Sequence, residues 1–198
     1  MNKIKEIIIG TNNGGKYKEI CALLPKNVKK YSPKEFDILT PKETGKTFEK
    51  NSFIKASYFS RKTNLICLSD DSGLEIDLLK GRPGIYSSRW SGHKNNFDLA
   101  IKRVFKEMSK LKKDWKNDSL ARFICCMTLF WPDGKSYSAT GTIKGKISHK
   151  IKGKNGFGYD PIFIADGYNQ TFGEMKPILK MSIDHRFKAF LKIKKFFI

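Results

Sequence analysis

Residues 65–73 read Leu-Ile-Cys-Leu-Ser-Asp-Asp-Ser-Gly, and this stretch decides the fold that we expect. The apolar run from Leu65 to Leu68 predicts a buried strand. The adjacent carboxylates Asp70 and Asp71 are then expected at the tip of that strand, where open α/β sheets bind their ligands. Because successive residues of an extended chain point to opposite sides, the two acids are expected to do different jobs, one facing a cleft and one bracing the turn.

Two interpretations of this acid pair stay open from the stretch alone. Paired carboxylates suit a hard cation, because such ions prefer oxygen ligands. The alternative is an Asx turn, since Asp, Ser and Gly are common turn formers. Beyond Gly73, the alternating residues Leu74 to Leu79 predict a second strand.

A glycine-containing loop follows the strand predicted at Lys5 to Gly10. Its sequence is Thr11-Asn12-Asn13-Gly14-Gly15-Lys16, and a helical pattern that ends at Pro25 comes next. Such a loop offers backbone N–H groups, a positive helix end and a lysine to a phosphate group. It differs from the Walker pattern because Tyr17 follows the lysine. An ordinary strand-to-helix turn is the alternative.

A second helix is predicted from Phe48 to Arg61, with Thr47 as its expected N-cap. Lys55 lies inside this helix. Glu43 lies just ahead of this helix and is free to turn toward a cleft. The plainer interpretations are a loop acid at the surface and a lysine on a solvated helix face.

The other predicted elements follow from apolar periodicity. They are an edge strand near Phe36 to Leu39, a helix from Asn96 to Met108, a hairpin of Ala121 to Trp131 with Lys135 to Ile147 that is expected in a second lobe, a short strand at Ile162 to Ala165, and a basic amphipathic helix from Ser182 to Phe197.

Two late segments also carry candidate binding residues. The loop from Asn155 to Pro161 presents Phe157 and Tyr159, which suit stacking on a nucleobase or, alternatively, packing on the core. Lys180, His185 and Arg186 are expected to cluster near the start of the last helix, where they would face an anion. Both segments are therefore candidates for nucleotide binding, and the packing alternative stays open for the aromatic loop.

Composition limits the classes of function. The chain has 198 residues, as expected for one domain or two closely packed lobes, and a net charge of +20. This charge fits a solvated surface enriched in lysine by compositional bias, and it would also suit nucleic acid, a membrane surface or small polyanions. A nucleic-acid-binding protein is one alternative, but the lysines are spread widely and the carboxylate pair argues against it. The four cysteines show no metal-site spacing, and there is no apolar signal-peptide core or membrane-spanning run, so we expect a cytoplasmic protein with reduced core thiols.

Together these motifs resemble the inosine triphosphate pyrophosphatases over nearly the whole chain. In order, the matching segments are Thr11 to Lys16, Glu43-Thr44-Gly45 with Thr47-Phe48, Asp70 to Leu74, Pro83 to Ser87, Gly156 to Pro161, Asp166-Gly167-Tyr168 with Gln170-Thr171 and Glu174-Met175, and Lys180 with His185-Arg186.

The resemblance implies an α/β fold with a mixed sheet, formed by one domain over residues 1–198. This domain would be elongated, with two lobes and a central cleft, and would form a homodimer. It also implies Mg²⁺-dependent hydrolysis of ITP, dITP and XTP to the monophosphate and pyrophosphate, with no membrane and no stable nucleic-acid partner. A different base preference, or a degenerate nucleotide sensor, are the alternatives within this class.

The resemblance further implies a role for each matching residue. Glu43 and Asp71 would hold the metal, and Asp71, with Asp70 and Lys16 beside it, would be catalytic. The implied substrate contacts are Thr11, Asn12, Asn13, Gly14, Gly15, Lys16, Lys55, Ser72, Arg89, Phe157, Gly158, Tyr159, Asp160, Lys180, His185 and Arg186.

Two positions depart from the pattern of that family. Asp184 stands where the family usually has serine, and an acid there could pair with Arg186 or repel the substrate. Arg89 stands where some members have lysine, which keeps the charge but changes the hydrogen-bonding geometry. The first change bears on the choice of base more than on hydrolysis.

Overall fold

The computed structural model describes residues 3–92 and 96–198, and within them a seven-stranded sheet runs in the order β2-β1-β3-β5-β6-β7, with β4 paired to β3. β1 pairs in parallel with β2 and β3, whereas β3–β4 and β6–β7 are antiparallel, so the predicted mixed α/β fold is confirmed. The strands are β1 Glu6–Ile9, β2 Lys29–Tyr31, β3 Cys67–Ile76, β4 Arg82–Pro83, β5 Leu120–Phe130, β6 Ser136–Ile147 and β7 Phe163–Ala165. The helices are α1 Gly14–Leu23, α2 Phe48–Thr63, α3 Phe97–Leu111, α4 Pro177–Ile183 and α5 His185–Ile193.

The chain divides into two compact units. Unit 1 comprises residues 1–71, 125–141 and 185–198, and unit 2 comprises residues 72–124 and 142–184. The turn of the β5–β6 hairpin and the strand residues next to it therefore belong to unit 1. The open end of the hairpin belongs to unit 2.

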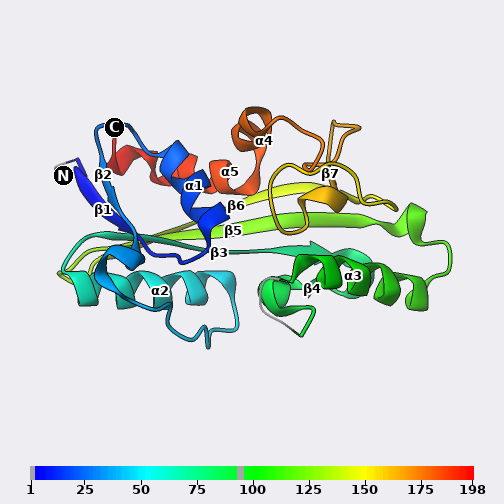
Figure 1. Ribbon diagram of the computed structural model, residues 1–198, viewed down its shortest axis with the longest axis horizontal. Coiled ribbons are helices and arrows are strands. Elements are labelled where there is room, and N and C mark those ends of the chain that lie inside the picture. The colour runs from blue at the N-terminus through cyan, green and yellow to red at the C-terminus, as the bar shows by residue number, and fades with distance from the viewer. Residues whose placement is uncertain (1–2, 93–95) are drawn as a thin grey trace. The chain divides into compact units, whose positions relative to one another are not determined.

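Unit 1 buries its strands on both faces. Ile7 and Ile9 of β1 belong to the same apolar cluster as Ile20 of α1 and Phe190 of α5, while Ile8 belongs to a second cluster with residues of α2. Figure 1 shows the corresponding layers, with α1 and α5 on one side of the unit 1 strands and α2 on the other. Alternate side chains of one strand thus enter different cores, as the period of two requires.

Unit 2 has its own core, which α3 covers with its apolar stripe. Ala100, Ile101, Val104 and Met108 are buried there, and Asn96 is the N-cap, whose side-chain oxygen accepts the Leu99 N–H. Three stacked or tilted aromatic rings also belong to this core, with centroids 4.6 to 6.0 Å apart; they are those of Phe123, Phe163 and Phe172.

The predicted strand tip was wrong. β3 continues without a break from Cys67 to Ile76, so Asp70 and Asp71 lie in mid-strand, and the second predicted strand shortens because Asp77–Leu79 form a 3₁₀ turn. The acids remain in the strand because cationic and amide side chains of neighbouring helices satisfy them, which a local pattern does not reveal. The Asx-turn alternative falls with the same observation.

Two further predicted boundaries were wrong. The edge strand is Lys29–Tyr31, and residues 33–36 form a 3₁₀ turn because Pro33 opens it and the Glu35 carboxylate accepts the Ser32 N–H. The last helix is two helices, because Asp184 is extended (φ −71°, ψ 173°) between α4 and α5. Lys180 therefore belongs to a different helix from His185 and Arg186.

The thiols follow the sequence-based expectation. Cys67, Cys125 and Cys126 are buried and Cys21 is half-buried, and all four, each within the described residues, lack a disulfide. Among the helices of residues 3–92 and 96–198, none combines the length and the apolar character that crossing a bilayer requires.

Candidate functional site

The loop before α1 is built to present backbone N–H groups. Asn13 is the N-cap, and its Oδ1 accepts the backbone N–H of Lys16 at 3.0 Å. Thr11 Oγ1 accepts the N–H of Asn13 at 3.2 Å, and the Ser69 hydroxyl of β3 donates to the Gly10 carbonyl at 2.7 Å. The remaining N–H groups and the positive end of α1 are of the kind that can receive a phosphate group, so phosphate binding at this loop stays a prediction.

Asp70 faces α1 and α5. Its Oδ2 lies 3.1 Å from Lys16 Nζ and 3.1 Å from Arg186 Nη2, and the other terminal nitrogen of Arg186 donates to Glu19. Burial raises the pKa of the Asp70 carboxyl, but Lys16 and Arg186 outweigh it, so its net pKa is far below the ordinary range. Asp70 is therefore an ionised anchor for two cations.

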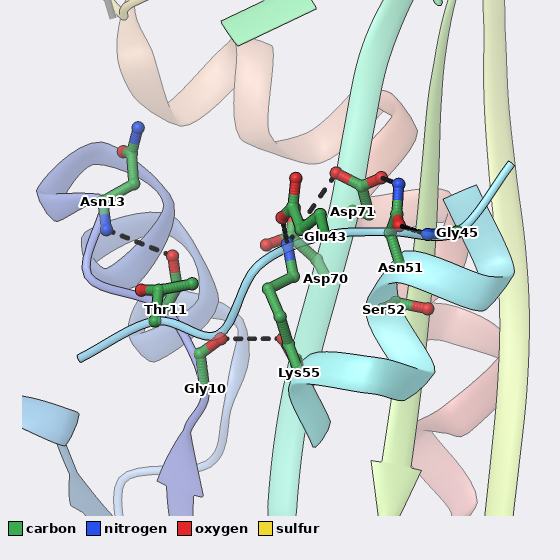
Figure 2. A network of polar contacts seen from close by, with 12 residues as sticks. Gly10, Thr11, Asn13, Glu43, Gly45, Asn51, Ser52, Lys55, Asp70 and Asp71 are labelled. Atoms are coloured by element: carbon green, nitrogen blue, oxygen red, sulfur yellow. Dashed lines mark hydrogen bonds and ion pairs between the residues drawn. The ribbon is translucent and has the colours of Figure 1, made fainter. Parts of the chain in front are cut away.

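Asp71 faces α2 instead, so the two acids point to opposite sides as predicted, but neither braces a turn, because both lie inside β3. Lys55 Nζ of α2 lies 2.5 Å from Glu43 Oε1 and 3.7 Å from Asp71 Oδ1 (Figure 2). The plain interpretations of Glu43 and Lys55 as solvated residues were wrong, because Lys55 is buried and its ammonium joins both acids. One cation thus already bridges the two predicted metal ligands.

Charge and burial oppose each other in this cluster. Burial lowers the pKa of Lys55, yet Asp71 and Glu43 outweigh it and raise the net pKa, so the ammonium stays charged. Burial, with repulsion from Glu43, raises the pKa of the Asp71 carboxyl despite the nearby ammonium. A carboxylate whose pKa is raised accepts a proton more readily than an exposed one.

Asn51 is a site residue that sequence reasoning missed. Its side-chain amide is buried and donates to Asp71 Oδ2 at 3.0 Å (Figure 2). The signal available in the sequence was its spacing, because Asn51 lies four residues before Lys55 and so shares that face of the helix. Glu19, whose carboxylate pairs with Arg186, was also missed. It lies three residues after Lys16 and so shares that face of α1.

The donor set of this cluster fits Mg²⁺. Glu43 and Asp71 supply hard carboxylate oxygens, and both lie within reach of a single cation, the Lys55 ammonium. Among residues 3–92 and 96–198, no group of three or more His, Cys, Asp or Glu side chains is placed to hold a metal. Two carboxylates are enough for Mg²⁺, which usually binds one or two protein carboxylates and completes its coordination shell with substrate phosphates and water.

Unit 2 carries a second buried ion pair among the predicted residues. Lys180 Nζ lies 2.7 Å from Asp160 Oδ2, and its ammonium also sits 5.2 Å from the centroid of the Phe157 ring. The same Asp160 oxygen accepts the N–H of Phe157 at 2.9 Å. Gly156 has φ 74°, and a Cβ there would meet that oxygen at 2.0 Å, so this turn needs glycine.

The aromatic loop of unit 2 divides between the two interpretations. Tyr159 is buried and its hydroxyl donates to the Ser87 carbonyl at 2.9 Å, so it packs on the core. Phe157 is only half-buried beside Lys180. Arg89 lies over the Tyr86 ring at 5.0 Å, and Ser72 is half-buried at the point where unit 2 begins.

Within unit 1, contacts join many of the predicted residues into two networks, which meet at the adjacent residues Asp70 and Asp71. The network of Asp70 contains Thr11, Asn13, Lys16 and Arg186, with Glu19 added, and the network of Asp71 contains Glu43 and Lys55, with Asn51 added. Asn12 instead donates to Thr40 at 3.0 Å, Gly14 and Gly15 open α1, and His185 is buried at the first residue of α5. Phe157, Asp160 and Lys180 form the separate cluster of unit 2.

Acid is expected to weaken the Asp70 anchor. The pKa of Asp70 in the folded chain is below the unfolded value near 3.9, so its contribution to stability is present above about pH 4 and is lost as the pH falls below it. We expect the stability difference between the wild type and Asp70→Asn, from urea unfolding at pH 3 to 7, to shrink below pH 4. An equal difference throughout that range would contradict the assignment.

The chain is similar to a known protein family along nearly its whole length. The model of the Ham1 family matches residues 7–196 of the chain. The chain belongs to the Ham1 family. The predicted resemblance is thereby confirmed, and the enzyme hypothesis is favoured over the nucleic-acid-binding alternative.

Relatives of this Ham1 family member cover nearly its whole length. It is 41% identical over 188 residues to the dITP/XTP pyrophosphatase of Rhodospirillum centenum, covering 94% of this chain and 92% of that protein. It is 40% identical over 198 residues to the enzyme of the same name from Bartonella quintana, with the same coverage. The solved HAM1 protein of Coxiella burnetii matches with a TM-score of 0.87 and 33% identity over 97% of this chain and 98% of that one.

Proposed function

We propose that this protein hydrolyses the non-canonical purine nucleoside triphosphates dITP, XTP and ITP to the monophosphate and pyrophosphate. One observation carries the proposal. The Lys55 ammonium lies between the Glu43 and Asp71 carboxylates, in a chain that is 41% identical to a dITP/XTP pyrophosphatase. Acids that share a buried cation beside a phosphate-binding loop suit cleavage of a phosphoanhydride.

Binding the triphosphate requires positive charge, and unit 1 supplies it. The backbone N–H groups at the start of α1 and the Lys16 ammonium face the phosphates, and Lys55 adds a second positive charge. Asp70 holds Lys16 and Arg186 in place and so fixes where that charge is presented.

Glu43 and Asp71 would hold Mg²⁺, which supplies neutralisation of phosphate charge when bound. Asp71 is proposed as the proton acceptor: it would take a proton from the attacking water while the water oxygen bonds to the α-phosphorus and the anhydride bond to the β-phosphate breaks, which releases pyrophosphate. Its carboxylate lies in the same cluster as Glu43 and Lys55, which supports this role, because a general base must lie within hydrogen-bond reach of the proton that it takes. Lys55 would stabilise the charge that develops on the phosphate oxygens.

The contacts to the nucleotide and the oligomeric state are proposed from the resemblance to the family. Ser72, Arg89, Phe157, Gly158, Tyr159, Asp160, Lys180, His185 and Arg186 are proposed to contact the nucleotide, and the chain to form a homodimer. Inosine and xanthosine carry an oxygen at position 6, where adenine has an amino group. Donors such as backbone N–H groups or Arg186 would donate a hydrogen bond to this oxygen. The amino group of adenine would instead face donors and find no acceptor.

A panel of nucleoside triphosphates with Mg²⁺ tests the proposed selectivity. We expect kcat/KM for dITP and XTP to exceed that for dATP by about a hundredfold or more, because unmet buried hydrogen bonds discriminate strongly. Pyrophosphate release is measured against orthophosphate release for each nucleotide. Equal rates for dITP and dATP would overturn the choice of base, and would favour a pyrophosphatase with a different preference.

A further inference from the structure

We propose that Asn51 is a positioning residue that holds Glu43 and Asp71 in the geometry that the metal ion requires. The inference rests on the function proposed above, because it takes these two carboxylates as the metal ligands. It concerns a residue outside that set, on α2, whose side chain joins the segment that carries Glu43 to strand β3.

The contacts of Asn51 run in two directions. Its Nδ2 donates to Asp71 Oδ2 at 3.0 Å, and its Oδ1 accepts the backbone N–H of Gly45 at 2.8 Å (Figure 2). Gly45 is only two residues after Glu43. One buried amide therefore ties the two metal-binding segments together.

The chemistry of the amide explains why asparagine stands here. The donor end must face a carboxylate and the acceptor end must face an N–H, so a single orientation of the side chain satisfies both partners. Aspartate has the right shape but would turn an acceptor toward Asp71. Alanine would leave both partners without this bond in a buried place, which is costly.

The Glu43 segment is shaped for this contact. A Cβ on Gly45 would meet Asn51 Oδ1 at 2.7 Å and Lys50 Cβ at 2.8 Å, so only glycine lets the backbone approach the amide this closely. The close approach is thus built from both sides, by a small residue in the loop and an amide on the helix.

Electrostatics make such a tie necessary. Glu43 and Asp71 repel each other, and the Lys55 ammonium that joins them sits at the end of a flexible stem. A metal ion needs its ligands at fixed positions, and residues that orient metal ligands usually change metal affinity by about 10- to 100-fold when removed. Asn51 is placed to supply that orientation.

The test compares Asn51→Ala with Ser52→Ala. Ser52 is the next residue, is equally buried, and its hydroxyl lies 2.7 Å from that of Thr128, so its loss controls for damage to the interior of α2. Two quantities are measured for each variant and the wild type. They are the Mg²⁺ concentration that gives half-maximal dITP hydrolysis, and the rise in melting temperature that MgCl₂ causes without nucleotide.

We expect Asn51→Ala to raise the half-maximal Mg²⁺ concentration by about 10- to 100-fold and to shrink the MgCl₂-induced rise in melting temperature. Ser52→Ala should lower the melting temperature in EDTA but leave both Mg²⁺ responses unchanged. If Asn51→Ala does not fold, Gly45→Ala replaces it, since its Cβ pushes the loop away from the amide with the amide retained. It should shift the Mg²⁺ responses in the same direction.

The outcomes separate this inference from the function on which it rests. A wild type whose dITP hydrolysis needs no Mg²⁺ would overturn the proposed metal site itself. A Mg²⁺-dependent wild type whose responses are unchanged in the folded variant, Asn51→Ala or its replacement, would overturn the role of Asn51 alone. An equal Mg²⁺ shift in Ser52→Ala would also overturn it, because the effect would then belong to the packing of α2.

Discussion

Replacing Asp71 with asparagine is expected to lower kcat for dITP by about a thousandfold or more while the protein stays folded. Asparagine keeps the shape of the side chain but removes the negative charge, so both the proposed metal ligand and the proposed proton acceptor are lost. Asn51 and Lys55, the neighbours of Asp71 on α2, remain in place. The measurement is the initial rate of pyrophosphate release at saturating dITP and Mg²⁺.

The matched control for this variant is Asp114→Asn. Asp114 is exposed, and the same change in charge there should leave kcat unaltered. The melting temperature of Asp71→Asn, measured alongside, shows whether the loss of rate is a loss of chemistry or of fold. Turnover near that of the wild type in a folded Asp71→Asn protein would contradict the catalytic assignment.

Replacing Asp70 with asparagine is expected to destabilise the fold more than any other single charge removal proposed for this chain. Asp70 is fully buried, and its carboxylate faces Lys16 and the equally buried Arg186. Removing one partner of a buried ion pair leaves charge uncompensated and costs about 3–5 kcal/mol. In a protein of this size that corresponds to a fall in melting temperature of about 10 °C.

Thermal unfolding at pH 7 measures this effect, with Asp133→Asn as the control. Asp133 pairs with Lys135 at the surface, 3.0 Å away, where both side chains are largely exposed. Solvent screens such a pair, so its loss should leave the melting temperature unchanged. If Asp70→Asn melts with the wild type, the buried network contributes nothing to stability and its proposed anchoring role fails.

The two aspartates show how far the sequence alone reaches. Their opposite partners follow from the geometry of an extended chain, and the loop before α1 follows from its glycines and lysine. The continuation of β3 through these acids did not follow, because Ser69, Asp70 and Asp71 have the local character of a turn. Partners distant in sequence satisfy these acids within the strand, namely Lys16, Arg186, Lys55 and Asn51.

The C-terminal helices show a second limit. An amphipathic pattern continues across Asp184, so one helix was expected where there are two. Ile183 packs against the core of unit 2, whereas Phe190 lies in the core of unit 1. Periodicity reports that a face is buried, but not which core buries it.

The central claim is that this protein cleaves the bond between the α- and β-phosphates of dITP with Mg²⁺ held by Glu43 and Asp71. ³¹P NMR of the products, with Mg²⁺ and with excess EDTA, tests it most directly. We expect dIMP and pyrophosphate as the products with Mg²⁺, and unchanged dITP in EDTA. Formation of dIDP with orthophosphate, or the same products at the same rate in EDTA, would contradict it.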